Sequence, residues 1–343
     1  TIINKAIVQG IPLLFGSTGE IIPEKSVIEG FRSRFLFNAE IPALGYKVFK
    51  VVKTNTQESF GVRQMANKIS TGKFEVEFNK NDGSVNIYSK DLGKSFGYIM
   101  RPECYEDLAD TWCFNADCCG NKLEDCSLSE ISITESGIYR TVVKVSLSFR
   151  KSIITLYYTF YDEENYFDVK YKINWNEKHT ELKLVTDMGD DSLIVSSPFS
   201  SEKRADSPAD TPMGEWISSA TDGGGISVIA NGIFSYTKNG NILSLNLLRS
   251  CIFGDLRISE LDSRDHSIME QGILEGELRC FIHKDSFVEA EIANKAVQFN
   301  NPPIVICEAN HDGAYPTEAS FFEIKAKSVI VSAWKMAEDG DGQ

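Results

Sequence analysis

The sequence lacks any segment that would place the protein in a membrane or send it out of the cell. No apolar run approaches the roughly 20 residues that a membrane-spanning helix needs. The residues from Thr1 onward do not show the basic and then apolar order of a secretory signal. We therefore expect no membrane partner and a cytoplasmic location, in which the eight cysteines stay reduced.

Clustered positive charge is missing as well. The chain has 35 Lys and Arg residues against 49 Asp and Glu residues, which gives a formal net charge of −14. Nucleic-acid binding needs basic residues gathered on one face, and here they are scattered among more numerous acids. This balance predicts no nucleic-acid partner and leaves neutral small molecules and sugars open.

The common catalytic and metal-binding motifs are also absent. The four histidines form no H-E-x-x-H motif, and no serine or cysteine lies in a G-x-S-x-G elbow. Five cysteines lie between Cys104 and Cys126 without a C-x-x-C pair, so we favour free thiols over the alternative of a zinc cluster. Acidic pairs lie in predicted turns, where solvated side chains are usual. The sequence therefore predicts neither a catalytic residue nor a metal site in this chain.

What the chain does contain is a long series of strand patterns. Phe74–Phe78 alternates apolar and polar residues, Asn81-Asp82-Gly83 has turn chemistry, and Val85–Tyr88 alternates again, which predicts a hairpin. Helical periodicity is confined to Phe60–Ile69. Repeated strands with few helices predict an all-β fold, a large antiparallel β-sandwich. The further strand segments cover residues 131–134, 139–149, 153–161, 166–175, 225–230, 234–236 and 242–248.

The length of the chain and a linker-like segment predict two domains. A chain of 343 residues exceeds what one hydrophobic core usually serves. Residues 1–53 contain three prolines and short strand patterns, and the polar stretch Thr54–Ser59 is typical of a linker. We predict a small β-sandwich domain over residues 1–53, whether complete or cut short, and a large β-sandwich domain over residues 54–343. Because no strand follows the final Asp339–Gly342 turn, we expect the C-terminal strand to be truncated.

Six segments along the chain match motifs that occur together, in the same order, in one known family. They are Ile41–Phe49, Asp110-Thr111-Trp112, Trp175–His179 with Leu182-Lys183, Ser197-Pro198-Phe199 with Arg204 and Trp216, Leu247–Ser250, and Ser332–Lys335 with Glu338-Asp339-Gly340. Together they resemble the C-terminal β region of glycoside hydrolase family 38, the α-mannosidases. Two positions depart from the family pattern: Ser200 stands where glycine is usual, and Arg264-Asp265-His266 replaces an Asp-x-Gly-x-His element.

The resemblance implies both a fold and a parent activity. The fold would be a large supersandwich of the galactose-mutarotase type, preceded by a small β-sandwich domain. The parent protein would be a metal-dependent retaining α-mannosidase, a glycosidase of mannose metabolism that hydrolyses terminal α-mannosyl residues of a mannose-containing glycan or mannosyl conjugate. Zinc or another divalent metal and the catalytic residues would lie in an N-terminal catalytic domain outside this chain. The chain would then be inactive alone, would need no cofactor, and would frame the active site, in a parent that forms a homo-oligomer as family members often do.

Three residues are candidates for the rim of that active site. Arg249 and Arg204 fall in matched segments, and a planar guanidinium can bond sugar hydroxyls or a neighbouring carboxylate. His266 lies in the loop that follows Arg249. The alternative for Arg249 is a structural ion pair.

Two other functions stay open on the sequence. One is a stand-alone carbohydrate-binding, lectin-like β-sandwich module, which would stack sugars on exposed aromatic residues. The other is a structural scaffold for assembly.

Overall fold

Two compact units make up the chain. One unit combines Thr1–Ser59 with Asn301–Gln343, and the other is Phe60–Asn300. Residues 301–343 thus cluster with the first unit, whereas the sequence-based division places them in the large domain. The computed structural model describes residues 5–8, 11–15, 20–23, 33–34, 39–52, 67–107, 109–112, 119–137, 139–188, 192–219, 224–252, 269–306, 312–325, 329, 331, 333 and 335–340.

The first unit is built from short strands. Its larger sheet has the order β4-β3-β2-β1-β6, in which β1 and β6 run parallel and the other pairs antiparallel. A separate pair joins β5 (Gly45–Lys47) to β26 (Glu318–Ser320), beside which the ring centroids of Tyr46 and Phe321 lie 5.6 Å apart. This long-range pairing explains why residues 301–343 belong to this unit. The strands of the larger sheet are β1 (Lys5–Val8), β2 (Ile11–Phe15), β3 (Glu20–Pro23), β4 (Ser33–Arg34) and β6 (Lys50–Val52).

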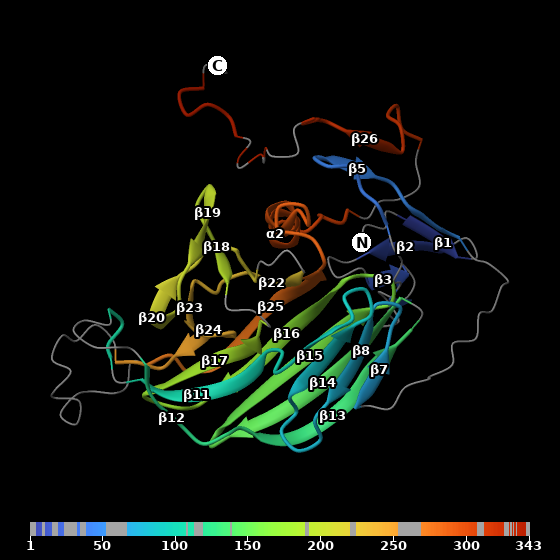
Figure 1. Cartoon of the computed structure of the whole chain (residues 1–343). Coiled ribbons are helices and arrows are strands. Elements are labelled where there is room, and N and C mark those ends of the chain that lie inside the picture. The colour runs from blue at the N-terminus through green and yellow to red at the C-terminus, as the bar shows by residue number, and fades with distance from the viewer. Residues whose placement is uncertain are drawn as a thin grey trace. The chain divides into compact units, whose positions relative to one another are not determined.

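The described part of the second unit contains antiparallel sheets of four, six and nine strands, whose arrangement Figure 1 shows. The four-stranded sheet has the order β10-β9-β8-β7, the six-stranded sheet β12-β11-β17-β24-β23-β20, and the nine-stranded sheet β13-β14-β15-β16-β25-β22-β21-β18-β19. The prediction of an all-β fold with a large antiparallel sandwich is confirmed. The strands are β7 (Lys68–Ser70), β8 (Phe74–Phe78), β9 (Val85–Ser89), β10 (Lys94–Phe96), β11 (Arg101–Asp107), β12 (Cys119–Lys122), β13 (Ser127–Ser136), β14 (Arg140–Phe149), β15 (Ser152–Tyr161), β16 (Tyr166–Trp175), β17 (Thr180–Asp187), β18 (Leu193–Ser197), β19 (Ser200–Arg204), β20 (Ser207–Pro212), β21 (Trp216–Ser219), β22 (Gly225–Ala230), β23 (Ser235–Asn239), β24 (Ile242–Arg249) and β25 (Gly272–His283).

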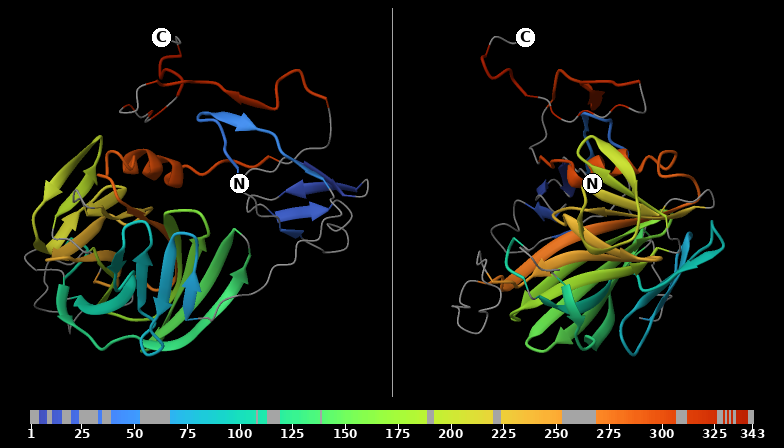
Figure 2. Two further views of the ribbon diagram at one scale, coloured as in Figure 1. Left: turned by 45° about the vertical axis from the view of Figure 1, so that its right-hand side comes forward. Right: turned by 60° about the vertical axis from the view of Figure 1, so that its left-hand side comes forward.

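The four-stranded sheet packs against the centre of the nine-stranded sheet (Figure 2). Phe74 and Phe78 of β8 are buried and point inward, and their ring centroids lie 6.1 Å from Phe167 and 5.5 Å from Tyr158. The turn between β8 and β9 places Gly83 at φ 71°, a left-handed conformation that glycine adopts without strain. The predicted hairpin of Phe74–Phe78 and Val85–Tyr88 is therefore confirmed, and its apolar face is the one that faces the core.

Long neighbouring strands form the centre of the nine-stranded sheet. β14, β15 and β16 pair in chain order, and β16 pairs with β25. Their inward side chains share one hydrophobic core with the two smaller sheets, in which the rings of Phe149 and Trp175 stack with centroids 6.2 Å apart. β13 forms one edge, and its register with β14 shifts at two places along the strand. The strands predicted from residue 139 to residue 175 are confirmed.

A helix, α2 (Ile292–Asn300), covers the opposite face of the nine-stranded sheet. Its buried residues Ile292 and Ala296 pack on Trp216, Ile229 and Phe281 of strands β21, β22 and β25. This helix was not predicted from the sequence. Of the helix predicted at residues 60–69, residues 60–66 lie outside the described part and the remainder enters strand β7. Within the described residues, no helix has the length and apolar character needed to cross a membrane.

Candidate functional site

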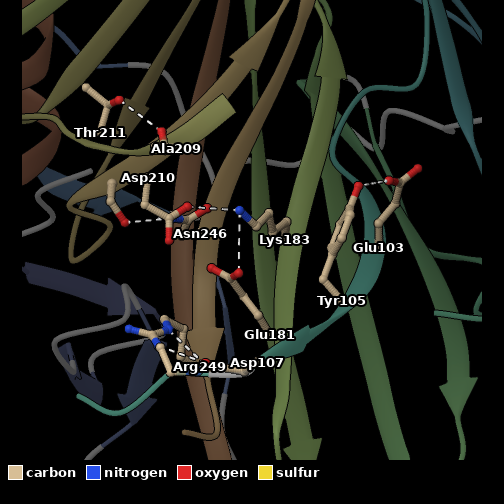
Figure 3. A network of polar contacts seen from close by, with 12 residues as sticks. Glu103, Tyr105, Asp107, Glu181, Lys183, Ala209, Asp210, Thr211, Asn246 and Arg249 are labelled. Atoms are coloured by element: carbon tan, nitrogen blue, oxygen red, sulfur yellow. Dashed lines mark hydrogen bonds and ion pairs between the residues drawn. The ribbon is translucent and has the colours of Figure 1, made fainter. Parts of the chain in front are cut away.

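The six-stranded sheet carries a buried polar face. Along β17, Leu182 and Leu184 point into the hydrophobic core, so Glu181 and Lys183 point to the opposite side. Glu181 and Asp107 are 0% exposed, and Lys183 is 1% exposed. Buried charges are costly unless they are paired. The ion pairs on this face therefore determine which of its charged groups could contact a ligand. We call the set the Arg249 network, and it consists of Glu103, Tyr105, Asp107, Glu181, Lys183, Asp210, Asn246 and Arg249 (Figure 3).

Three of the recognised sequence motifs meet at one end of this sheet. Trp175 donates from Nε1 to Ser250 Oγ at 2.5 Å, and the backbone N–H of His179 donates to the carbonyl of Ser250 at 2.8 Å. Arg249 donates from Nη2 to the carbonyl of Asp110 at 3.2 Å. The Trp-x-Glu-x-His, Leu-Leu-Arg-Ser and Asp-x-Trp motifs are far apart along the chain, yet these bonds hold them side by side.

Arg249 is fixed by a two-point ion pair. Its Nε lies 2.9 Å from Asp107 Oδ2 and its Nη2 lies 2.8 Å from Asp107 Oδ1. Charge-assisted bonds in this fork geometry are among the stronger and more directional ones in proteins. The Arg249 side chain stays 20% exposed, while that of Asp107 is fully buried. Arg249 therefore forms the structural ion pair that was its alternative role, and its contact with a sugar stays a prediction.

A second buried cation, Lys183, lies between two carboxylates. Its Nζ is 3.0 Å from Asp210 Oδ1 and 3.5 Å from Glu181 Oε2. In the described part of the chain, neither carboxylate oxygen of Glu181 has a hydrogen-bond partner. Burial raises the pKa of Glu181 to about 7. The positive charges of Lys183 and Arg249 lower this pKa, and the negative charges of Asp210 and Asp107 raise it. The charge of Glu181 therefore changes near neutral pH.

The buried Glu181 carboxyl predicts a pH-dependent stability. Its folded-state pKa of about 7 exceeds the ordinary 4.5, so the folded chain holds this proton more tightly than the unfolded chain. The resulting stabilisation is complete below pH 4.5 and is lost as the pH rises through 7. Glu181→Gln, which is neutral at every pH, is expected to raise the free energy of unfolding at pH 8 by about 1–3 kcal/mol and to change it little at pH 4.

Urea unfolding of both proteins at pH 4 and pH 8 measures this effect. The matched control is Glu202→Gln on the edge strand β19, where the Glu202 side chain is 50% exposed. An equal gain from both substitutions, or a gain for Glu181→Gln that does not depend on pH, would contradict the assignment.

Ion pairs hold most charged side chains of the Arg249 network in place. Glu103 is 7% exposed and pairs with Arg101 and Lys122. Glycoside hydrolysis needs two carboxyl groups that reach the scissile bond from opposite sides. Asp107 and Glu181 are both enclosed, so neither is open to a sugar in this conformation. The network positions the Arg249 guanidinium and does not itself form an accessible catalytic pair.

The other two predicted rim residues have different positions. Arg204 ends β19, an edge of the nine-stranded sheet, and pairs with Glu202 of the same strand. The structure therefore places Arg204 and Arg249 on different sheets, each with its own carboxylate partner. His266 lies outside the described residues, and its role stays a prediction.

The structure describes part of the cysteine-rich segment, residues 104–126, in which a zinc cluster was the alternative to free thiols. Cys104 and Cys126 are free and buried, and the hydrogen bond between their thiols, together with burial, raises the pKa of Cys104. Cys113 and Cys118 lie outside the described residues, as does the side chain of Cys119. Across the part of the chain that the structure describes, no group of three or more His, Cys, Asp or Glu side chains could hold a metal ion. The described residues do not fit a metal centre.

Sequence reasoning found Arg249 but missed its surroundings. Asp107 and Glu181 belong to no matched motif, and Lys183 lies in the matched segment Leu182-Lys183 but was given no predicted role. The alternation of charged residues with leucine along β17 was the available signal, and it predicts a strand with one polar face. Nothing in that local pattern indicates that the polar face is buried.

The sheets define a large antiparallel β-sandwich protein, and the clustered motifs are those in which the sequence resembles family 38. Residues 69–257, more than half of the chain, match the family model described as the glycosyl hydrolases family 38 C-terminal domain. The chain therefore belongs to this family. The resemblance drawn from the sequence motifs is confirmed.

Two solved structures share the fold at 15% sequence identity each. An alpha-mannosidase from Enterococcus faecalis V583 superposes with a TM-score of 0.56 over 69% of this chain and 31% of that one. A protein in the glycosyl hydrolase family 38 from Enterococcus faecalis superposes with a TM-score of 0.64 over 80% of this chain and 37% of that one. The chain thus spans about a third of the length of these structures. No curated protein matches it in sequence.

Proposed function

We propose that this chain is the non-catalytic β region of a metal-dependent retaining α-mannosidase. In this proposal the parent enzyme hydrolyses terminal α-mannosyl residues of a mannose-containing glycan or mannosyl conjugate. Its metal and its catalytic carboxylates belong to an N-terminal catalytic domain, and the β region packs beside that domain as its intramolecular partner. A cytoplasmic, homo-oligomeric enzyme is part of the same proposal.

The Arg249 network carries the proposal. Family motifs from three distant segments converge on one sheet end, where the two-point bond to Asp107 holds the guanidinium of Arg249 in one orientation. A guanidinium fixed in this way can hydrogen-bond a sugar hydroxyl or a carboxylate of a neighbouring domain without a further entropic cost of ordering. The residues of this chain would position the rim of the active site and take no chemical step.

Family membership and coverage support the same division of labour. The chain matches a C-terminal domain family and spans 31% of the alpha-mannosidase from Enterococcus faecalis V583. The described acids of the Arg249 network are paired or enclosed. A separate catalytic domain accounts for each of these observations.

An activity assay tests the proposal. The purified 343-residue chain is expected to show no hydrolysis of an aryl α-mannoside with zinc or cobalt added. A longer protein that includes the coding sequence upstream of Thr1 is expected to hydrolyse the same substrate. Turnover by the pure 343-residue chain would refute the division of labour. A start codon directly before Thr1 would refute the parent enzyme.

A further inference from the structure

The outward face of the four-stranded sheet differs in character from its core face. In β8 and β9, buried residues alternate with exposed ones, and Phe74, Val76 and Phe78 make up the core side of β8. The exposed positions of these two strands are Glu75, Glu77, Asn86 and Tyr88. This face belongs to a different sheet from the Arg249 network.

Strand register arranges these side chains in two rows across the sheet. Tyr88 pairs with Glu75 on one side and with Ser95 on the other, and Glu75 pairs with Ser70. The neighbouring row consists of Asn86, Glu77 and Lys68. Because directly paired residues of antiparallel strands point to the same side, all of these side chains share one surface. We call this surface the Tyr88 face.

The Tyr88 face lines a hollow. Its volume is about 460 Å³, and its lining includes every residue of both rows. Tyr88 stands between the polar residues with 42% of its surface exposed. An exposed tyrosine ring presents a flat apolar surface with a polar tip, which suits ligands that have both an apolar face and hydroxyl groups.

The charges on the Tyr88 face balance one another. Lys90 Nζ lies 2.8 Å from Glu75 Oε1, and Ser70 Oγ donates to the same oxygen at 2.7 Å. Lys68 Nζ lies 3.1 Å from Glu77 Oε1. The hydrogen bond from Lys90, then that from Ser70, lowers the pKa of Glu75, so its carboxylate stays an acceptor at neutral pH. Together with Lys90 beside it, the face has two carboxylates and two ammonium groups, which gives no net attraction to a polyanion or a polycation.

We propose that the Tyr88 face binds a neutral oligosaccharide. One sugar ring would lie on the Tyr88 ring, while the Asn86 amide and the carboxylates of Glu75 and Glu77 would hydrogen-bond its hydroxyls. Bonds from hydroxyls to carboxylates are charge-assisted and directional, which supplies selectivity for a polyol. An apolar peptide fits this face poorly, because charged groups surround its one aromatic side chain. The site does not depend on the activity of the proposed parent enzyme.

Saturation-transfer NMR on the whole 343-residue chain tests this site. The probes are an α-linked mannotriose and maltotriose, with inorganic phosphate as an anionic control. We expect saturation of at least one trisaccharide with a Kd of about 1–10 mM, and none of phosphate. Tyr88→Ala is expected to weaken that binding at least about tenfold, since it removes the stacking surface. Tyr88→Phe keeps the ring and is expected to retain affinity within about threefold.

A matched control separates the Tyr88 face from unspecific contact with aromatic residues. Tyr139 is exposed to 45%, close to the value for Tyr88, and Tyr139→Ala is expected to leave binding unchanged. Thermal melts of all variants check that each one is folded. Absence of saturation for both trisaccharides, or binding that survives Tyr88→Ala, would overturn the proposal. Loss of mannosidase activity in a longer protein would not bear on it.

Discussion

Replacing Arg249 by alanine is expected to lower the free energy of unfolding by about 3–5 kcal/mol. The substitution removes both bonds from Arg249 to the Asp107 carboxylate, which is 0% exposed and would lose its cationic partner. It also removes the bond to the carbonyl of Asp110, which ties the Asp-x-Trp motif to the end of β24. Urea unfolding followed by circular dichroism at pH 7 measures the loss.

A surface ion pair of the same geometry provides the control. Arg150 also contacts one carboxylate at two points, through Nε and Nη2 to Glu124. Both side chains of this pair are about half exposed, at 42% and 55%, so water can replace the bonds. Arg150→Ala is expected to have a much smaller effect than Arg249→Ala. Equal losses from the two substitutions would show that burial of Asp107 does not control the strength of the Arg249 pair.

Removal of the Trp175 side chain is expected to cost about 3–5 kcal/mol of stability. Trp175 is 1% exposed and stacks on Phe149 with an interplanar angle of 6°. Its indole N–H also donates to Ser250 Oγ, so Trp175→Ala removes a core ring and leaves the Ser250 hydroxyl short of a donor. Thermal and urea unfolding of Trp175→Ala, with Trp175→Phe as an intermediate case, measure the effect.

Trp112 offers the matched comparison for Trp175. It belongs to another of the family motifs, but its side chain is 65% exposed. Trp112→Ala is expected to change stability by less than about 0.5 kcal/mol, as surface substitutions usually do. If Trp112→Ala proved as damaging as Trp175→Ala, the difference in burial between the two indoles would not be the cause.

Local patterns predicted most of the large sheets. The segments that became β14, β15 and β16 alternate or run apolar and are separated by short turns, and both properties are set within about ten residues of sequence. The hairpin of β8 and β9 was found for the same reason, since Gly83 and its neighbours encode the turn. A meander of antiparallel strands needs only such local strand and turn signals, because each strand pairs with the next one along the chain.

The same local patterns could not predict contacts between segments that are far apart in the sequence. The pairing of β26 with β5 joins residues about 270 positions apart, as in the bond from Tyr46 to Pro316. The helix α2 has two fully packed positions, Ile292 and Ala296, which give a weak apolar stripe. The β-sheet surface on which it packs supplies the rest of its stabilisation, and a helix pattern does not encode that surface.

Of the Arg249 network, only Arg249 itself was predicted as a site residue. Arg249 was found through a motif, while its partner Asp107 lies 142 positions away and carries no motif of its own. Whether Glu181 faces water or the interior depends on what covers the sheet, and the sequence of β17 is the same in either case. The raised pKa of Glu181 is therefore a property of tertiary structure.

The edge strand β13 has a consequence for how the molecule behaves among its own copies. Its ladder with β14 breaks register between Leu128 and Glu130 and again between Ile133 and Glu135. Each break is an irregularity that twists the strand and spoils the even spacing of its outer N–H and C=O groups. A second chain that docked along β13 would find no continuous row of bonds, so we expect this edge to be a poor template for adding a strand to the nine-stranded sheet.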